Sequence, residues 1–430
     1  MSITAAFFTG LSGLDTHATA MQVIGDNIAN VQTTGFKAGA AHFEDVLGMS
    51  LTGLTANNQT GAGAGVASVD SNFIQGSLEA TGVSTDVAVN GQGLFILGVP
   101  DTNEVTYSRA GHFFFDEEGY YANTDGYRVQ GYLYDSTGLN LIENLADIRI
   151  DQNSMIPPKV TSDIDMVVNL DADEPVITGV FDAADPTTYQ FSTTVTIYDS
   201  LGDSHQVQVF FTQSDLQEWT WNAMIDGSDV QSGIPGVFEL YGTGTLEFDT
   251  LGQLTSSSAM AMPVDFYAGS ASSAIGFFAN GLAPPATTIN FTFTTQFASP
   301  SAIEVLKQDG YPAGNLSGVG IDSEGNLVAN YTNGLRKNMA RIALADFPSL
   351  NGLARVGDTL YRATTTSGDP LYNKPGVGGM GTIASSMLEE SNVDLAAEFI
   401  RMILIQRGYQ ANTKVITTAD DMLAQLINIR

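Results

Sequence analysis

The stretch that decides the fold lies near the C-terminus, where residues 388–427 read LEESNVDLAAEFIRMILIQRGYQANTKVITTADDMLAQLI. A large apolar or aromatic residue recurs there at every seventh position, a spacing typical of a coiled-coil helix. The companion seam keeps only Phe399 and Ile427, because polar residues interrupt it between them. Ser391 and Asp394 resemble a capping box, and Asn392 is a second candidate for the N-cap. The seven-residue seam consists of Leu388, Leu395, Met402, Tyr409, Ile416 and Leu423.

The first 30 residues repeat this period and predict a second helix, roughly 45 Å long. This helix contains Gly10, Gly13 and Gly25, and each glycine costs about 0.8–1 kcal/mol relative to alanine. Neither end helix is self-sufficient, so its apolar face must be buried against a partner. Two interpretations stay open: a hairpin of both ends in one chain, or a bundle built between many copies whose ends fold on assembly. The N-terminal seam consists of Phe7, Leu11, Leu14, Met21 and Ile28.

The segments next to the end helices have a different composition. Residues 48–72 are rich in Gly, Thr, Asn and Ala, which predicts an extended or flexible connector. A matching connector is expected over 364–382, before the C-terminal helix.

Everything between about residues 72 and 372 reads as short strands and turns. Residues 86–97 predict a hairpin with Asn90-Gly91 in its turn, and 187–213 alternate cleanly around a turn at 201–203. The fold class is therefore mainly β with α-helical termini: nested all-β domains on a terminal helical coiled-coil domain that both chain ends build. The predicted parts are a helical polymerisation domain (1–30 and 386–430), a connector (31–71 and 373–385), an inner β domain (72–162 and 299–372) and an acidic outer β domain (163–298).

Charged residues are few, and most of them are acidic. The 430 residues include 47 acidic and 16 basic side chains, for a net charge of −31. Such a chain lacks the basic face that nucleic acid or anionic lipid requires. No basic residue lies between Lys159 and Lys307, which suggests an inserted domain that repels its neighbours. A saline habitat that selects acidic surfaces is an equally open explanation.

The sequence contains no set of residues with the types and spacing typical of a catalytic, nucleotide or metal site. Cysteine is absent and only four histidines are present, which leaves little for metal or thiol chemistry. Gly91-Gln92-Gly93 suits a turn better than a nucleotide loop, and the carboxylates at 171–174 lack the EF-hand spacing. Asp203, Ser204 and His205 are adjacent only in the sequence. A catalytic Ser-His-Asp triad instead consists of residues that the fold brings together. We expect no enzyme, no catalytic residue, no cofactor and no metal.

No run reaches the ~18 apolar residues that span a bilayer. The first basic residue is Lys37, so the N-terminus lacks the basic region of a usual secretory signal. We expect no membrane insertion, and either retention inside the cell or export without a cleaved signal.

Three segments resemble the axial proteins of the bacterial flagellum, the rod and hook subunits. The first lies at 11–37, the second at 75–111 and the third at 391–412. The third segment departs from many relatives by carrying Gly408 after Gln406-Arg407. The motif residues are Asn27, Ala29, Asn30, Thr33, Gly35, Phe36, Gln406, Arg407, Tyr409, Gln410, Ala411 and Asn412.

This resemblance implies a structural subunit that polymerises into a curved, flexible tube and transmits torque from rod to filament. The chain length and the large insert favour the hook branch of the family over a distal rod or other axial subunit. The resemblance also implies an extracellular location at the hook and basal body, and export through the flagellar type III apparatus. Its implied partners are further copies of the chain, rod and hook–filament junction subunits, and the hook cap. A β-rich surface adhesin is the alternative of another class.

Overall fold

A computed structural model describes residues 3–47, 61–102, 104–229, 234, 236–258 and 287–428. The chain forms two compact units, which we describe separately. The first unit comprises Met1–Gln152, Ser317–Asn330 and Arg336–Arg430, and the second comprises Asn153–Leu316 and Tyr331–Leu335. The predicted class, mainly β with helical termini, is confirmed.

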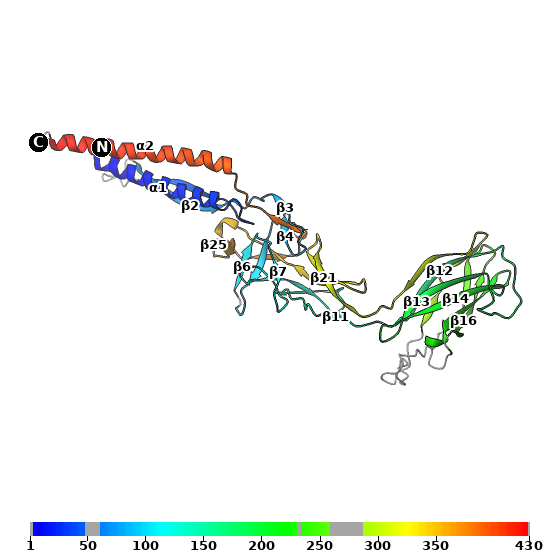
Figure 1. The fold of residues 1–430 in the computed structure, drawn as a ribbon. Helices are drawn as coiled ribbons and strands as arrows, with labels where there is room; N and C mark the ends of the chain where they lie inside the picture. The colour runs from blue at the N-terminus through cyan, green and yellow to red at the C-terminus, as the bar shows by residue number, and fades with distance from the viewer. Residues whose placement is uncertain are drawn as a thin grey trace. The chain divides into compact units, whose positions relative to one another are not determined.

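Both predicted end helices are present. Helix α1 spans Ile3–Ala29 and helix α2 spans Leu395–Asn428, and they lie side by side in opposite directions (Figure 1). The N-cap of α2 is Asp394, whose Oδ1 accepts hydrogen bonds from the backbone of Ala396 and Ala397 at 2.9 and 3.2 Å. The expected start at Ser391 or Asn392 was therefore wrong by about one turn.

Leu388 does not belong to the helical seam. It lies in strand β29 (Met387–Glu389), which pairs with β3 (Leu78–Ala80). The seven-residue period extends one step beyond the helix, because β29 also presents an apolar side chain at that position.

The expected flexible connector contains a hairpin. Strands β1 (Gly39–Leu47) and β2 (Gly61–Ser71) pair antiparallel and pack against α1. Gly63 of β2 serves close packing, because a Cβ added there would lie 1.9 Å from Ser12 Oγ. The intervening residues 48–60 of the expected connector lie outside the described residues.

The second expected connector also contributes strands, β27 (Leu371–Asn373) and β28 (Thr382–Ser385). Strand β28 pairs with β4 (Val87–Asn90), so β4 forms no hairpin with β5 (Leu94–Gly98). After the Asn90-Gly91 turn, β5 instead pairs with β6, β9 and β24. The predicted hairpin over 86–97 was therefore wrong.

The β domain of the first unit packs around Leu94, Ile96, Tyr107, Phe347 and Tyr361. Its other elements are β6 (Val105–Ser108), β7 (Phe114–Phe115), β8 (Tyr121–Ala122), β9 (Arg128–Tyr134), β10 (Leu141–Asp147), β22 (Asn326–Tyr331), β23 (Arg336–Ile342), β24 (Leu344–Asp346), η2 (Leu350–Gly352), β25 (Ala354–Gly357) and β26 (Leu360–Arg362).

The second unit is a sandwich of a four-stranded and a five-stranded sheet. Alternate residues of both sheets meet in one core, where Trp219 and Trp221 are fully buried. The chain enters and leaves this unit through adjacent segments, since Ile156 pairs with Gly314 and Lys159 with Tyr311. Its elements are β11 (Met155–Ile156), β12 (Asp163–Asp171), β13 (Phe191–Tyr198), β14 (Ser204–Asp215), β15 (Glu218–Asp226), η1 (Gly227–Asp229), β16 (Phe238–Phe248), β17 (Leu254–Ser257), β18 (Thr288–Asn290), β19 (Thr295–Phe297) and β20 (Ala302–Gln308). Strand β21 (Gly314–Ile321) begins in this unit and continues into the first at Ser317.

A buried charge cluster joins three distant segments of the first unit. Glu389 Oε1 lies 2.5 Å from Lys37 Nζ, and its Oε2 lies 3.1 Å from Arg109 Nη1. The Glu389 and Lys37 side chains are fully buried, and that of Arg109 is 5% exposed. Burial lowers the pKa of both cations, and the nearby Glu389 carboxylate opposes that shift.

Backbone groups complete the cluster. Lys37 Nζ donates to Ile74 O at 2.9 Å, Arg109 donates to Val89 O and Gly91 O, and the Gly76 N–H donates to Glu389 Oε1. The cluster therefore fixes where the chain leaves α1 and where it approaches α2.

We expect Glu389→Gln to lower the free energy of unfolding by about 3–5 kcal/mol, because it leaves two buried cations without their anion. Urea unfolding of the full chain measures this change. The matched control is Glu390→Gln, whose exposed carboxylate accepts a hydrogen bond from Ser77 Oγ and which should cost about 1 kcal/mol. Equal losses in the two variants would contradict the role of the cluster.

His205 in β14 is the second buried charged group of interest. Its Nδ1 lies 3.4 Å from Asp229 Oδ2 and its Nε2 lies 3.8 Å from Asp199 Oδ2. Burial lowers the pKa of His205, but the two carboxylates outweigh burial and raise it above the ordinary 6.5.

A raised pKa in the folded state adds stability below about pH 6.5, and this contribution is lost as the pH rises through the folded pKa. We therefore expect the second unit of the wild type to lose stability between about pH 6 and pH 8. His205→Gln should flatten that part of the profile in thermal melts at fixed ionic strength. A variant with the same slope as the wild type would show that His205 is not the responsible group.

Candidate assembly surface

Helices α1 and α2 contact each other through small residues. A Cβ added at Gly13 would lie 2.7 Å from the side chain of Asn412, and one at Gly408 would lie 2.7 Å from the His17 ring. A Cβ at Gly10 would lie 3.0 Å from Ile416. These glycines cost helix propensity, but in return they let the two helices approach closely. Gly408, where the chain departs from many relatives, therefore has a packing role that the sequence analysis missed.

The hairpin of β1 and β2 covers another part of α1. Thr16 Oγ1 donates to Ala64 O at 3.1 Å, and the Ala64 N–H donates to Ser12 Oγ at 3.3 Å. The rings of His17 and Phe43 meet edge to face, 5.9 Å apart. Of the two interpretations of the end helices, the hairpin within one chain is thus present, and what remains for other copies is the surface that it leaves uncovered.

That uncovered surface carries many apolar side chains. On α2, Ile400 and Leu404 are each 61% exposed, and on α1 Phe8 is 65% exposed. Many large apolar side chains left exposed on neighbouring helices indicate a protein interaction site. We call this set the assembly surface; it comprises Phe7, Phe8, Leu11, Leu395, Phe399, Ile400, Ile403, Leu404, Tyr409, Val415 and Met422.

The predicted seams lie only partly on this surface. Phe7, Leu11, Leu395, Phe399 and Tyr409 are exposed. A second group is half-buried and lies at the edge of the contacts within the chain: Leu14, Met21, Ile28, Met402, Ile416 and Leu423. Ile427 lies in α2, but its side chain is outside the description. The α1 side chains that the chain itself buries, such as Thr16, Ala20 and Ile24, lie on a different face from the predicted seam.

Several motif residues shape the end of α1. Asn27 exchanges two hydrogen bonds with the backbone of Gly39, both 2.8 Å long. Thr33 donates to Asn30, which bonds back to Asp26 and closes the helix end. These contacts fix the direction in which the β1–β2 hairpin leaves the helix.

Gly35 and Phe36 continue this motif beyond the helix. Gly35 has a φ of 70°, and a Cβ there would lie 2.4 Å from the backbone nitrogen of Ala110. Phe36 is buried, with the Arg355 guanidinium 5.1 Å from its ring centre.

The motif residues on α2 behave differently. Gln406, Arg407, Gln410 and Ala411 are exposed, as is Ala29 on α1, while Asn412 is half-buried against α1. Contacts within one chain therefore explain Asn27, Gly35 and Asn412, but not the exposed motif residues.

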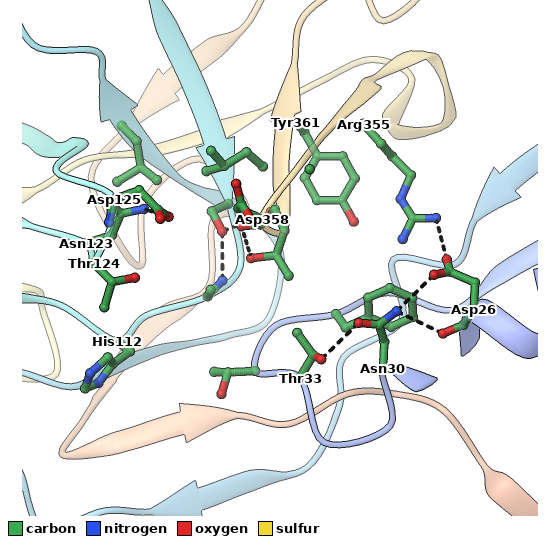
Figure 2. Close-up of a pocket in the computed structure, with 18 residues that line it drawn as sticks. Asp26, Asn30, Thr33, His112, Asn123, Thr124, Asp125, Arg355, Asp358 and Tyr361 are labelled. Atoms are coloured by element: carbon green, nitrogen blue, oxygen red, sulfur yellow. Dashed lines mark hydrogen bonds and ion pairs between the residues drawn. The ribbon is translucent and has the colours of Figure 1, made fainter. Parts of the chain in front are cut away.

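A polar cavity of about 590 Å³ lies where the end of α1 meets strands β25 and β26. Figure 2 shows Asp26, Asn30 and Thr33 on one side and Arg355, Asp358 and Tyr361 on the other. Asp26 and Arg355 approach to 3.7 Å across this junction. Among its lining residues, Ser108 Oγ donates to Thr359 O at 3.1 Å, and His112 Nδ1 lies 2.8 Å from Asp86 Oδ1.

Within the described parts of the chain, no group of three or more His, Asp and Glu side chains is placed to hold a metal ion. Asp171 accepts a hydrogen bond from the Asp173 backbone and so caps its own loop. None of the described helices has the length and apolar character needed to cross a membrane.

Four family models match successive parts of the chain. They are the flagella basal body rod protein (residues 7–37), the flagellar hook protein FlgE/F/G D1 domain (88–158), the flagellar basal body protein FlaE D2 domain (169–311) and the flagellar basal body rod FlgEFG protein C-terminal domain (384–429).

Full-length relatives give the same result. The chain is 34% identical to the flagellar hook protein FlgE of Escherichia coli over 429 residues, covering 99% of this chain and all of the relative. It is 33% identical to that of Borreliella burgdorferi over 452 residues, covering 99% of both. The crystal structure of Helicobacter pylori flagellar hook protein FlgE2 shares the fold, with a TM-score of 0.52 at 15% identity over 72% of this chain and all of that one. The chain therefore belongs to the flagellar hook protein FlgE family.

Proposed function

We propose that this chain polymerises into the flagellar hook, a short curved tube that links the rod to the filament and transmits torque while it bends. The family is a structural one, and membership implies assembly at the flagellum. The observation that carries the proposal for this chain is the assembly surface, which stays open although α1 and α2 already contact each other.

The burial of large side chains supports an interface between copies. Ile400, Ile403 and Leu404 follow one another on α2, and each is more than half exposed. Burying one such side chain contributes about 1.5–3 kcal/mol, so a polymer that covers this row gains a large driving force. The exposed seam residues and the exposed motif residues on α2 are the contacts that we assign to neighbouring copies.

We further infer that the subunit meets rod subunits at one end of the tube, hook–filament junction subunits at the other, and the hook cap during growth. Export through the flagellar type III apparatus, without a cleaved signal, would deliver it to an extracellular location. The glycines in α1 and α2 support this route, because they make both helices easier to unfold before passage. The four-part division of the chain into a helical domain, connector, inner β domain and acidic outer domain belongs to the same proposal.

We expect Leu404→Asp to block polymerisation and to leave the monomer folded. Leu404 is 61% exposed, so the change costs the monomer little, whereas a carboxylate in an apolar interface is strongly unfavourable. Sedimentation and electron microscopy report the polymer, and circular dichroism reports the fold of the monomer.

The matched control is Leu139→Asp, which changes an 81% exposed leucine in a turn of the β domain. This variant should form tubes like the wild type. Normal tubes from Leu404→Asp, or equal defects in both variants, would remove the support for an interface on α2.

A further inference from the structure

A smaller cavity of the first unit lies beside the buried charge cluster. Its volume is about 250 Å³, and it is bounded by the segment after β2, the turn between β4 and β5, Arg109 and η2. Pockets for drug-sized ligands have volumes of about 300–1,000 Å³, so a ligand that fits here has one ring or a few carbons. The lining side chains are Phe73, Gln75, Gln92, Leu94, Arg109 and Leu350.

The charge on this lining comes from Arg109. Among the described residues the lining contains no Asp or Glu, although the chain has 47 acidic and 16 basic side chains. The Glu389 carboxylate that pairs with Arg109 at 3.1 Å also pairs with Lys37 at 2.5 Å, so two cations share it. Asp346 in β24 acts on Arg109 through space, but the two form no ion pair within the described residues. The cavity therefore presents positive charge and suits an anion.

The Arg109 guanidinium also has an N–H group that lacks an acceptor among the described residues. Nη1 donates to Val89 O at 3.2 Å and to Glu389 Oε2 at 3.1 Å, and Nη2, which carries two hydrogens, donates to Gly91 O at 2.6 Å. No described group accepts a hydrogen bond from Nε. A buried donor without an acceptor is unfavourable, above all on a charged group. Nε and Nη2 form the edge of the guanidinium at which a carboxylate accepts two parallel hydrogen bonds.

The rest of the lining suits a short apolar body. Leu94 is 1% exposed, and Phe73 and Leu350 are half-buried against the same core. The Phe73 ring packs on Tyr361, with the ring centres 5.1 Å apart, so this wall is held in place. Walls that are already ordered lower the entropy cost of binding a ligand.

We propose that this cavity binds a small carboxylate whose apolar body has one ring or a few carbons. The carboxylate accepts hydrogen bonds from the Nε and Nη2 edge of Arg109, and the apolar body packs against Phe73, Leu94 and Leu350. The bound anion lies next to the cluster that fixes α1 and α2, so the ligand stabilises the folded first unit by mass action. This inference concerns the folded chain itself and does not depend on the proposed polymer.

The first test compares benzoate with benzamide, which has the same ring and nearly the same shape but no negative charge. NMR titration of the full chain, below the concentration at which it polymerises and in a buffer without carboxylate or phosphate, measures both affinities. We expect a Kd on the order of 1 mM for benzoate and a Kd at least about tenfold higher for benzamide. Equal affinities, or no benzoate binding at concentrations well above that value, would overturn the inference.

The second test is Gln92→Glu, which places a carboxylate on the lining without a change of size. Gln92 is exposed, so the fold is retained. The new carboxylate competes for Arg109 and repels the anion, so the Kd for benzoate should rise about tenfold. The matched control is Gln217→Glu, which adds the same charge to the exposed turn between β14 and β15 and should leave that Kd unchanged. Thermal unfolding shows that both variants are folded.

The third test locates the ligand on the wild-type chain. Nuclear Overhauser effects from the benzoate ring should reach the methyl groups of Leu94 and Leu350 and one arginine Nε–H, and Leu350→Met identifies the Leu350 signals. Contacts only with leucines elsewhere, or the same benzoate Kd for Gln92→Glu and the wild type, would overturn the inference. The proposed function would stand in either case, because it depends on the assembly surface of α1 and α2 and not on this cavity.

Discussion

The structure depends on one buried carboxylate. Glu389 holds Lys37 from the segment after α1 and Arg109 from the segment after β6, while the Gly35 N–H donates to its backbone oxygen at 2.7 Å. Because two cations and one anion are buried together, the three segments have one satisfactory arrangement. That arrangement sets the positions from which α1 and α2 extend, and therefore the positions of the side chains offered to other copies.

Glycine can mark either close packing or a flexible backbone in this chain, and the sequence alone does not distinguish the two. The seven-residue period predicted both helices, because helical periodicity is a local signal that packing later uses. The Gly- and Ala-rich composition of 61–71 suggested a flexible connector, yet these residues form β2, and a Cβ added at Gly63 would lie 1.9 Å from Ser12 Oγ. In the sequence, a glycine that allows two segments to pack closely cannot be told from a glycine that makes the backbone flexible.

The assembly surface and the contacts behind it were also only partly predictable from the sequence. The helical positions of Leu395, Phe399 and Tyr409 followed from spacing, and the structure leaves all three exposed. Glu389 was not predicted, because its partners lie 352 and 280 residues away in the sequence. The role of Gly408 was missed for the same reason, since His17 belongs to the other end of the chain. Pairings between the two ends of a chain leave no local pattern.

The second unit begins and ends at neighbouring points, where Ile156 pairs with Gly314 and Lys159 with Tyr311. A module whose termini are adjacent can be exchanged for another without changing the path of the host chain. The Glu389 cluster, α1 and α2 all belong to the first unit, so none of them depends on the size of that module. Evolution or an engineer can thus resize, delete or replace the sandwich and retain the polymerising framework.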